Sequence, residues 1–408
     1  MPIPKLVQIN ATCNWGSTGR IAEQIGLLAS EYGWDCYLVH GARYVQASKL
    51  KTIPVGSRRD DTLHAIKSKL WGGHGLGSVN ATRQMVENLK TIKPDLIHLH
   101  NIHGYYVNYQ ILFNYLHEAD IPVVWTLHDC WAMTGHCTHF DKIGCERWKT
   151  GCYDCPQKKA QYGTLLFNNC KRNWILKKEC FTSLHNLTIV PVSKWLGDIV
   201  KKSYLKDCRV KVINNGIDLE IFHPVKTDLR ERLDIPVDKT ILLGVASDWD
   251  EEKGLNEFIR LSMESRYQVV LIGLNEKQVR LMPKNVIALQ HTSNQQELVE
   301  YYNIADMLVN PTYNDTFPTV NIEALACGTP VITYRTGGSP EILSDKTGLI
   351  VERGDYNALL HAIEICRKNS KSYYYNECVL RAQTNYNKNE RFEDYIRLYN
   401  SLLKTNRH

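Results

Sequence analysis

The sequence lacks long apolar runs, repeats and a strong charge of one sign. No stretch of its 408 residues is long and apolar enough to cross a bilayer as a helix. The opening residues show no apolar core followed by a small-residue cleavage site, so we expect no secretory signal. The absence of repeats and low-complexity segments argues against solenoid and disordered classes. A formal net charge of +6 is too mild to imply nucleic acid by itself.

The overall composition is that of an ordinary globular protein, with 43% apolar and 23% charged residues. A chain of this length is too long for one typical core, so we expect two domains. The 13 cysteines are unusual for a cytoplasmic protein of this size. Because several of them cluster, they favour a metal site over a disulfide scaffold.

Short apolar runs alternate with helix-length amphipathic segments, a pattern typical of parallel α/β layers. In the first half we predict strands at residues 6–9, 36–39, 96–99, 123–127 and 187–192. In the second half we predict them at residues 210–213, 241–245, 269–272, 286–289, 307–309 and 331–333. Such runs suit strands that are buried on both faces.

Residues 310–343 form the most informative segment. Asp315 stands eight residues before Glu323, and a strand-like run and the pair Gly337-Gly338 follow. Between the acids lies a turn-like run made of Thr316, Phe317, Pro318 and Thr319. This order predicts a polar pocket where a helix begins, and a helix start suits a phosphate. Two acids suit hydroxyl-rich groups, so the segment indicates a nucleotide-sugar site; the alternative is an ordinary strand, loop and helix with two surface acids.

The segment resembles the acid-x7-acid signature of retaining glycosyltransferases of family 4 (glycosyl transferases group 1). These enzymes have the GT-B fold, in which two Rossmann-like domains with parallel sheets face each other across a cleft. The resemblance implies that the first acid binds the donor sugar and that Glu323 binds the ribose. The family usually has Glu at the first position, so Asp315 places its carboxylate one methylene shorter.

The resemblance covers nearly the whole chain and implies its domain organisation. We expect a first, acceptor-binding domain over residues 1–190, with a cysteine-rich insert at 130–157. A second, nucleotide-sugar domain is expected over residues 191–387. The closing segment 388–408 has helical spacing, and the family resemblance implies that it packs back on the first domain. The alternative is a terminal helix on the second domain.

Two motifs of the first domain match the family. Gly16, Gly19 and Arg20 follow the first predicted strand, where glycines permit close backbone approach and a helix start can bind an anion. His128 ends a predicted strand within T-x-H-D, and ligands gather at the carboxyl ends of parallel strands. The resemblance implies that His128 hydrogen-bonds the donor sugar, and we expect Asp129 to orient its imidazole. His98, His100 and His103 are weaker candidates.

One cation is predicted at the donor diphosphate. Lys253 keeps the Lys-Gly of the family, whereas Asp248 occupies the position where the family usually has an arginine. An acid is unfavourable beside a diphosphate unless it points away. Lys253, the helix start after Thr316 and Arg20 are the groups expected to neutralise the charge, and Arg335 is a further basic candidate.

The cysteine-rich insert has the spacing C-x7-C-x6-C-x2-C, formed by Cys137, Cys145, Cys152 and Cys155. Four thiolates make a closed tetrahedral zinc site, so we predict a structural zinc and no catalytic metal here. Two disulfides, a redox switch and free thiols are the alternatives. Cys130, His136 and His139 are nearby reserve ligands.

The leading prediction is a retaining hexosyltransferase without a catalytic cofactor. Its donor is a nucleotide-diphosphate sugar of UDP or GDP type, and its acceptor a glycan or lipid-linked glycan, as in capsule, exopolysaccharide or O-antigen biosynthesis. The alternatives are a nucleotide-sugar epimerase of the same fold and a non-enzymatic protein that binds zinc or nucleic acid. The weak net charge argues against a nucleic-acid partner.

Basic and aromatic residues recur in the first domain and raise the question of membrane contact. One group comprises Arg58, Arg59, Lys67, Lys69 and Trp71. A second comprises Lys171, Arg172, Trp174, Lys177 and Lys178. Such groups suit an anionic membrane surface, although they are more typical of solvated helix faces. We therefore expect a cytoplasmic protein, with peripheral contact at the cytoplasmic face of the inner membrane as the further hypothesis.

Overall fold

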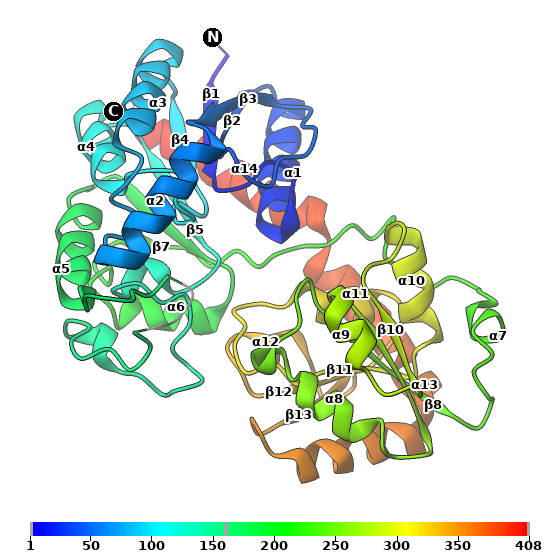
Figure 1. The fold of residues 1–408 in the computed structure, drawn as a ribbon. Coiled ribbons are helices and arrows are strands. Elements are labelled where there is room, and N and C mark those ends of the chain that lie inside the picture. The colour runs from blue at the N-terminus through cyan, green and yellow to red at the C-terminus, as the bar shows by residue number, and fades with distance from the viewer. Residues whose placement is uncertain (1–2, 159–161, 406–408) are drawn as a thin grey trace. The chain divides into compact units, whose positions relative to one another are not determined.

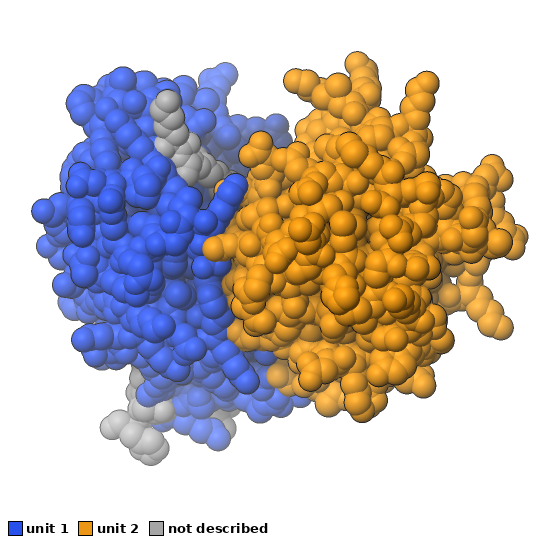
Figure 2. All heavy atoms as spheres, turned by 90° about the horizontal axis from the view of Figure 1, so that it is seen from below, with its two compact units in different colours: residues 1–214, 392–408 blue, residues 215–391 orange. Residues whose placement is uncertain are grey.

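The computed structural model describes residues 3–158 and 162–405. The chain divides into two compact units, which Figure 2 distinguishes by colour. Unit 1 comprises residues 1–214 and 392–408, and unit 2 comprises residues 215–391. Each unit contains one parallel β-sheet with α-helices (Figure 1), which confirms the predicted α/β class.

The sheet of unit 1 has the order β3-β2-β1-β4-β5-β6-β7, and every pairing in it is parallel. Its strands are β1 (Lys5–Asn10), β2 (Asp35–Gly41), β3 (Lys51–Val55), β4 (Leu96–Leu99), β5 (Val123–Leu127), β6 (Leu187–Pro191) and β7 (Arg209–Val210). The helices are α1 (Gly16–Glu31), α2 (Arg58–Trp71), α3 (Val79–Ile92), α4 (Tyr109–Ala119), α5 (Cys170–Phe181) and α6 (Lys194–Lys201). The strand order reverses beside β1, so ligands are expected at the carboxyl ends of β1 and β4.

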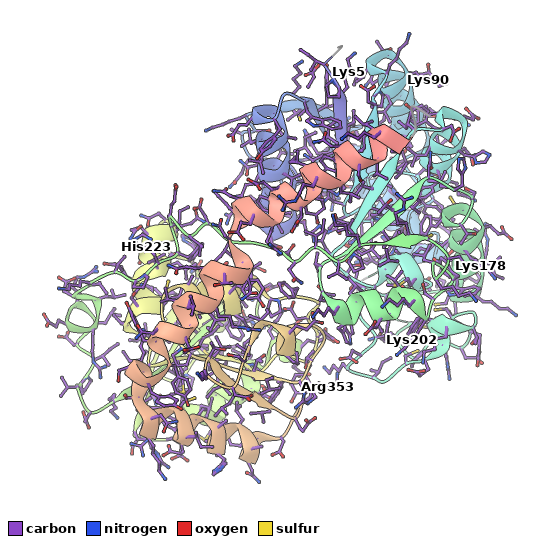
Figure 3. The ribbon with its side chains drawn as sticks, turned by 180° about the vertical axis from the view of Figure 1, so that it is seen from behind. Lys5, Lys90, Lys178, Lys202, His223 and Arg353 are labelled. Atoms are coloured by element: carbon purple, nitrogen blue, oxygen red, sulfur yellow. The ribbon has the colours of Figure 1, made fainter. Side chains whose placement is uncertain are left out.

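The closing helix α14 (Lys388–Thr405) contributes to the core of unit 1. Its apolar residues Phe392, Tyr395 and Tyr399 are buried in one cluster with Leu6 and Leu96 of the sheet. Figure 3 shows this helix lying along the strands of unit 1. The hydrophobic effect therefore joins the last residues of the chain to its first domain.

The sheet of unit 2 has the order β10-β9-β8-β11-β12-β13, again parallel throughout. Its strands are β8 (Thr240–Val245), β9 (Tyr267–Ile272), β10 (Val286–Leu289), β11 (Met307–Asn310), β12 (Val331–Tyr334) and β13 (Gly348–Val351). The helices are α7 (Leu229–Arg232), α8 (Leu255–Leu261), α9 (Glu276–Leu281), α10 (Gln295–Ile304), α11 (Thr319–Ala326), α12 (Ser339–Ile342) and α13 (Tyr356–Tyr386). Here the order reverses between β8 and β11.

The division between the units differs from the predicted boundary at residue 191. The chain stays with the first sheet until Asn214, because β7 pairs with β6 and Asn214 donates from Nδ2 to Val192 O at 2.8 Å. The strand predicted at 210–213 for the second domain is thus the two-residue β7 of the first. At the other end, residues 388–391 belong to unit 2 and only those from Phe392 onward to unit 1.

Two edge strands, β3 and β13, were not predicted. β3 is largely exposed and contains Pro54, and β13 is four residues long and begins with Gly348. Pro and Gly are depleted in strands, and edge positions need no continuous apolar run. No helix among the described residues is long and apolar enough to span a membrane.

Candidate active site

A lysine–aspartate pair lies at the carboxyl edge of the second sheet. The 3-10 helix η3 (Glu251–Lys253) follows β8 and ends at Lys253, whose Nζ lies 2.9 Å from Asp315 Oδ2. Asp315 follows β11, the strand next to β8 in the sheet. Burial lowers the pKa of Lys253, but the Asp315 carboxylate more than compensates and the pKa is raised. The pair therefore keeps the Lys253 ammonium protonated at the point where the strand order reverses, with Asp315 as its countercharge.

Two glycines make this close approach sterically feasible. Gly254 has φ +77°, and a Cβ there would lie 2.5 Å from Pro311 O. Gly337 has φ +52°, and a Cβ there would lie 1.6 Å from Asp315 O. Both positions combine a left-handed backbone with a contact that tolerates no side chain. Gly254 of the Lys-Gly motif thus lets its loop pack on Pro311, and Gly337 of the Gly-Gly motif lets its loop pack on the backbone of Asp315.

The run between the two acids forms the start of α11. Phe317 N donates to Asp315 Oδ1 at 3.2 Å, and Pro318 occupies the N-cap without a side-chain hydrogen bond. Thr316 and Phe317 are buried, and Thr319 is the first helical residue. The first N–H groups of a helix have no partner within it and carry a partial positive charge. An anion next to Lys253 is the ligand that this arrangement favours.

Glu323 lies one helical turn after Thr319 and is partly buried. Its Oε2 accepts a hydrogen bond from the hydroxyl of Tyr302, on α10, at 2.7 Å. Burial, and then the Glu323 carboxylate, raises the pKa of Tyr302 well above its usual value, so the phenol stays protonated and donates. The second acid is therefore held in place by a neutral neighbour.

The other charged candidates of this domain point elsewhere. Asp248 is exposed in the loop after β8, so the acid at the expected arginine position faces solvent. Arg335 pairs with Glu352, with Nε and Oε1 2.6 Å apart. The structure thus joins Lys253, and not Arg335, to Asp315.

In unit 1, the glycine-rich loop leads from β1 into α1. Gly16 is exposed with φ +64°, whereas Gly19 is buried, and a Cβ at Gly19 would lie 2.6 Å from Thr12 Oγ1. Arg20 is exposed on α1. Gly19 has a clear steric role in the loop, while anion binding by Gly16 and Arg20 stays a prediction.

His128 follows β5 and belongs to a chain of hydrogen-bonded side chains. Gln8 donates from Nε2 to Ala22 O at 2.7 Å, so its Oε1 accepts from His100 Nε2 at 3.0 Å. Nδ1 of His100 is then the acceptor for His128 Nε2, at 3.2 Å. This sequence of donors and acceptors places the proton of the His128 ring on Nε2 and the lone pair on Nδ1. Burial lowers the pKa of His128 to about 4, so its ring is neutral at neutral pH.

The expectation that Asp129 orients His128 is wrong. Asp129 Oδ2 instead lies 2.8 Å from His103 Nε2, and its Oδ1 accepts from Trp131 N at 2.8 Å. Burial raises the pKa of Asp129, but His103 outweighs it and the pKa falls to about 2. Adjacent residues of the strand end point to different partners, and His100 is the residue that orients His128.

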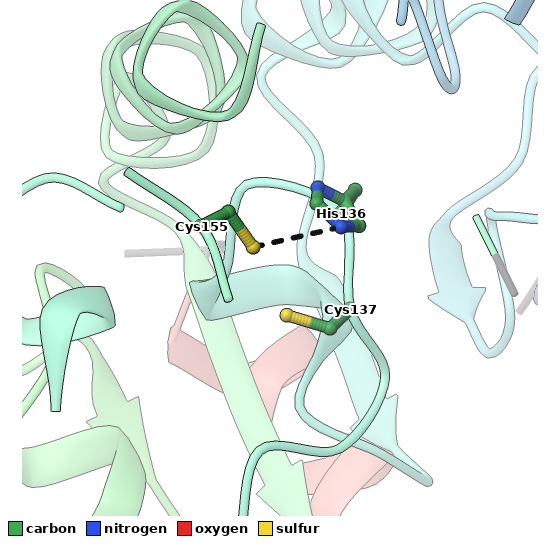
Figure 4. A group of neighbouring side chains, drawn as sticks. All are labelled: His136, Cys137 and Cys155. Atoms are coloured by element: carbon green, nitrogen blue, oxygen red, sulfur yellow. Dashed lines mark hydrogen bonds between the residues drawn. The ribbon is translucent and has the colours of Figure 1, made fainter. Parts of the chain in front are cut away.

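The four predicted cysteines Cys137, Cys145, Cys152 and Cys155 line one small cavity of the insert, and the reserve ligand His136 lies close to two of them. Cys137, Cys155 and His136 place ligand atoms within 4.8 Å of one another, as Figure 4 shows. Cys152 accepts a hydrogen bond from Gly135 N at 3.2 Å, and Cys145 is half-buried. Cys170, at the start of α5, lies 2.8 Å from His136 Nδ1. Cys170 was outside the predicted set because 15 residues separate it from Cys155, a gap that no short motif spans.

Comparison with known families places both halves of the chain. Residues 225–383 match the model of "Glycosyl transferases group 1", and residues 45–221 match that of "Glycosyltransferase Family 4". The chain belongs to the GT-B glycosyltransferases. The boundary between the matches lies near the division of this glycosyltransferase into its two units.

Relatives of this glycosyltransferase include enzymes of polysaccharide biosynthesis. It is 25% identical over 327 residues to the putative colanic acid biosynthesis glycosyl transferase WcaC of Escherichia coli K12, covering 77% of this chain and 78% of WcaC. It is 27% identical over 196 residues to the capsular polysaccharide biosynthesis glycosyltransferase CapM of Staphylococcus aureus. That match covers 43% of this chain and 51% of CapM.

Solved structures show the same fold. Sucrose-phosphate synthase from Thermosynechococcus elongatus superposes with a TM-score of 0.72 at 19% identity, covering 98% of this chain and all of that one. HepE from Anabaena, solved in complex with UDP, superposes with a TM-score of 0.66 at 14% identity, covering 98% of this chain and all of HepE.

Sequence reasoning missed Tyr302 in the second domain and ranked His100 in the first domain among the weaker candidates. Tyr302 fixes Glu323 from α10, and no motif marks it because tyrosine is also an ordinary core residue. His100 was a weaker candidate, and its contact with His128 arises from the neighbouring ends of β4 and β5. The signal that could have found it is the pair of strands that each end in histidine.

Proposed function

We propose that this glycosyltransferase is a retaining hexosyltransferase that uses a nucleotide-diphosphate sugar and acts in the assembly of a surface polysaccharide. The observation that carries the proposal is the Lys253–Asp315 pair beside the start of α11, with Glu323 one turn further on. The names of WcaC and CapM support the polysaccharide, and the HepE complex supports a UDP-type donor. A GDP-type donor fits the same anion site.

The second domain supplies the charge that donor cleavage requires. When the sugar leaves, negative charge builds on the diphosphate, and fixed positive groups stabilise it. Lys253 and the first N–H groups of α11 are such groups. Asp315 binds hydroxyls of the sugar, and Glu323 binds the ribose through the carboxylate that Tyr302 holds. Asp315 also keeps the Lys253 ammonium in position before the donor arrives.

The first domain contributes neutral groups and binds the acceptor. His128 hydrogen-bonds the transferred sugar as a neutral imidazole and so positions it without acting as a nucleophile. The acceptor is a glycan or a lipid-linked glycan, which matches the kind of product named for the relatives.

A surface of the first domain suits contact with an anionic membrane. It joins one face of α2 to residues 165–167, because Leu165 N donates to Lys69 O at 2.7 Å. Its apolar side chains, each at least half exposed, are Leu63, Ile66, Trp71, Leu165, Leu166 and Phe167. Exposed Arg58, Arg59, Lys67 and Lys69 on the same helix add positive charge. This surface would hold the enzyme where lipid-linked acceptors are.

The second basic group of the sequence does not form a comparable surface. Trp174 and Lys177 are buried inside the first domain, and only Lys171, Arg172 and Lys178 are exposed. Lys178, labelled in Figure 3, lies on the outer side of α5. The run 171–178 therefore gives no continuous basic face for nucleic acid.

The donor is tested by a thermal-shift and hydrolysis screen against UDP-, GDP-, dTDP- and CMP-sugars. We expect one nucleotide to raise the melting temperature, with slow release of the free nucleotide. Glu323→Gln should remove the shift. A changed sugar configuration without nucleotide release would replace the proposal with an epimerase, and inverted anomeric stereochemistry in the glycoside product would contradict the retaining mechanism.

Membrane contact is tested by sedimentation with vesicles of phosphatidylglycerol and phosphatidylethanolamine. We expect the wild-type enzyme to sediment with these vesicles and not with vesicles of phosphatidylcholine alone. The double variant Leu166→Glu, Phe167→Glu should stay in the supernatant. Val237→Glu, at an exposed apolar residue of the second domain, is the matched control. A wild-type enzyme that ignores anionic vesicles contradicts this part of the proposal alone.

A further inference from the structure

Three ligand-type side chains converge in the loop that follows His128. Ligand atoms of His136, Cys137 and Cys155 all lie within 4.8 Å of one another, and Figure 4 shows them turned toward a common point. His136 and Cys137 are buried, and Cys155 is half-buried. Two thiols and an imidazole are the ligand types that zinc prefers, and three of them leave one tetrahedral position to fill.

The ring of His136 is oriented as a metal ligand requires. Its Nε2 lies 3.0 Å from Gln157 O, and a carbonyl can only accept, so this nitrogen carries the proton. The lone pair then belongs to Nδ1, which lies 2.8 Å from Cys170 Sγ, whereas Cys155 Sγ lies 3.8 Å from the protonated Nε2 and must shift toward Nδ1 to share a metal ion with it. Histidines that bind metals usually donate their second ring N–H to a carbonyl or carboxylate in this way.

Cys170 completes the set from a different element. Its Sγ lies 2.8 Å from His136 Nδ1, and its thiol is hydrogen-bonded to that of Cys155. The loop reaches α5 because residue 135 is glycine: a Cβ there would lie 2.6 Å from Cys170 O. Close packing of the loop on the first residue of α5 is therefore built into the chain.

A buried lysine interacts electrostatically with these thiols. Lys177 is fully buried, and its Nζ donates to Trp131 O at 2.8 Å and to Thr134 O at 3.1 Å. Both hydrogen-bond partners are neutral carbonyls, and burial lowers the pKa of Lys177 to about 7 although the nearby thiols and Asp129 oppose this shift, so a further negative charge beside it would stabilise the ammonium. A Zn²⁺ ion with three thiolates and a neutral imidazole carries a net charge of −1, which matches one lysine.

We propose that His136, Cys137, Cys155 and Cys170 bind one structural Zn²⁺ ion, with Lys177 as the buried countercharge. On binding, each of the three thiols releases its proton to solvent and becomes a thiolate ligand. The site is closed, with no position for substrate. The metal ties the loop after β5 to α5, and this loop includes Trp131, whose N–H binds Asp129.

The metal is tested on the wild-type enzyme purified without chelator. We expect one zinc per chain by mass spectrometry of the metal. X-ray absorption at the zinc edge should give three sulfur neighbours at about 2.3 Å and one nitrogen at about 2.0 Å. Removal of zinc should lower the melting temperature of the first domain, and added zinc should restore it.

Variants identify the ligands, with zinc content as the readout. Cys155→Ser and Cys170→Ser should lose the metal, while Cys145→Ser and the matched control Cys180→Ser, at a half-buried thiol elsewhere on α5, should keep it. A wild-type enzyme without zinc, or with a disulfide among these cysteines, overturns the proposal. Four sulfur neighbours would exclude His136, and loss of zinc in Cys152→Ser but not in Cys170→Ser would exclude Cys170. None of these outcomes depends on the donor or on turnover.

Discussion

The two domains place different chemistry at the carboxyl ends of their parallel strands. In the first, the strand ends carry histidines such as His100 and His128, which are hydrogen-bonded to each other and neutral. In the second, the strand ends carry Lys253 and Asp315, which are charged and paired. The same parallel scaffold thus supports one neutral and one ionic site.

Burial explains this difference. Desolvation is the largest influence on the pKa of His128 and His100 and lowers both, because no carboxylate is close enough to reverse it. At Lys253 desolvation acts in the same direction, but Asp315 overrides it. Under the proposed function, the site that binds the diphosphate needs a charged cation, and the site that only orients the sugar does not.

The largest effect is expected from Gly337→Ala in the ionic site. A Cβ at this position would lie 1.6 Å from Asp315 O, so the loop must move and carry Asp315 away from Lys253. We expect donor binding to be lost, measured by the thermal shift with the preferred nucleotide sugar. Gly354→Ala is the control, because Gly354 also has a positive φ of +80° but its Cβ would meet nothing closer than 3.5 Å. Equal losses in both variants would show that backbone strain alone matters.

Lys253→Gln removes the cation and keeps much of the side-chain volume. Loss of one fixed group that stabilises developing charge costs about 100–1000-fold. We expect kcat/KM to fall by about this factor, with the folded state retained. Lys284→Gln, at an exposed lysine that precedes β10, should change nothing measurable. A fall below about fivefold for Lys253→Gln would remove Lys253 from the diphosphate site.

In the neutral site, a smaller loss is expected from His128→Ala. One hydrogen bond from a neutral group contributes about 1 kcal/mol, so kcat should fall about fivefold with little change in KM. Asp129→Asn should have a weaker effect, since Asp129 binds His103 and Trp131 rather than His128. Steady-state kinetics of both variants measures the two losses. A larger loss of kcat in Asp129→Asn than in His128→Ala would contradict the assignment of His128 as the residue that contacts the sugar.

Much of this comparison could be predicted from the sequence, because local motifs encode it. The acid pair, Lys253-Gly254 and Gly337-Gly338 lie within loops whose order along the chain marks a parallel sheet. The GT-B fold was predicted correctly, since most strands are continuous apolar runs. The edge strand β3 was missed because it is exposed and interrupted by Pro54, whereas β13 contains the short apolar run Leu349 to Val351 and was overlooked.

Partnerships between distant segments could not be predicted. Asp129 adjoins His128 in sequence, yet it binds His103, because successive residues at a strand end point in different directions. Tyr302 and Cys170 reach the sites from helices whose packing no local pattern specifies. The boundary at Asn214 depends on β7, a two-residue strand that is visible only through its pairing with β6.

The last effect concerns stability rather than turnover, and it appears only in acid. The first domain holds five histidines with lowered pKa: His64, His74, His98, His100 and His128. Unfolded histidines titrate near pH 6.5, so below that pH the unfolded state binds more protons than the folded state. We expect the first domain to lose stability as pH falls from about 6.5 toward 4, measured by urea unfolding with hydrogen exchange resolved by domain.

His64→Gln isolates one of these titrations away from the candidate site. His64 Nε2 accepts from Gly77 N at 3.0 Å, and burial lowers the pKa of the ring to about 4, so protonation would break this bond. In the variant, the free energy of unfolding should change less steeply with pH. The loss of one titrating proton lowers this slope by at most about 1.4 kcal/mol per pH unit. His185→Gln, at an exposed histidine, is the control and should leave the slope unchanged. If the stability of both domains of the wild-type enzyme fell equally with pH, the contrast between the neutral first domain and the ionic second domain would be wrong. Buried histidines would then not distinguish the two domains.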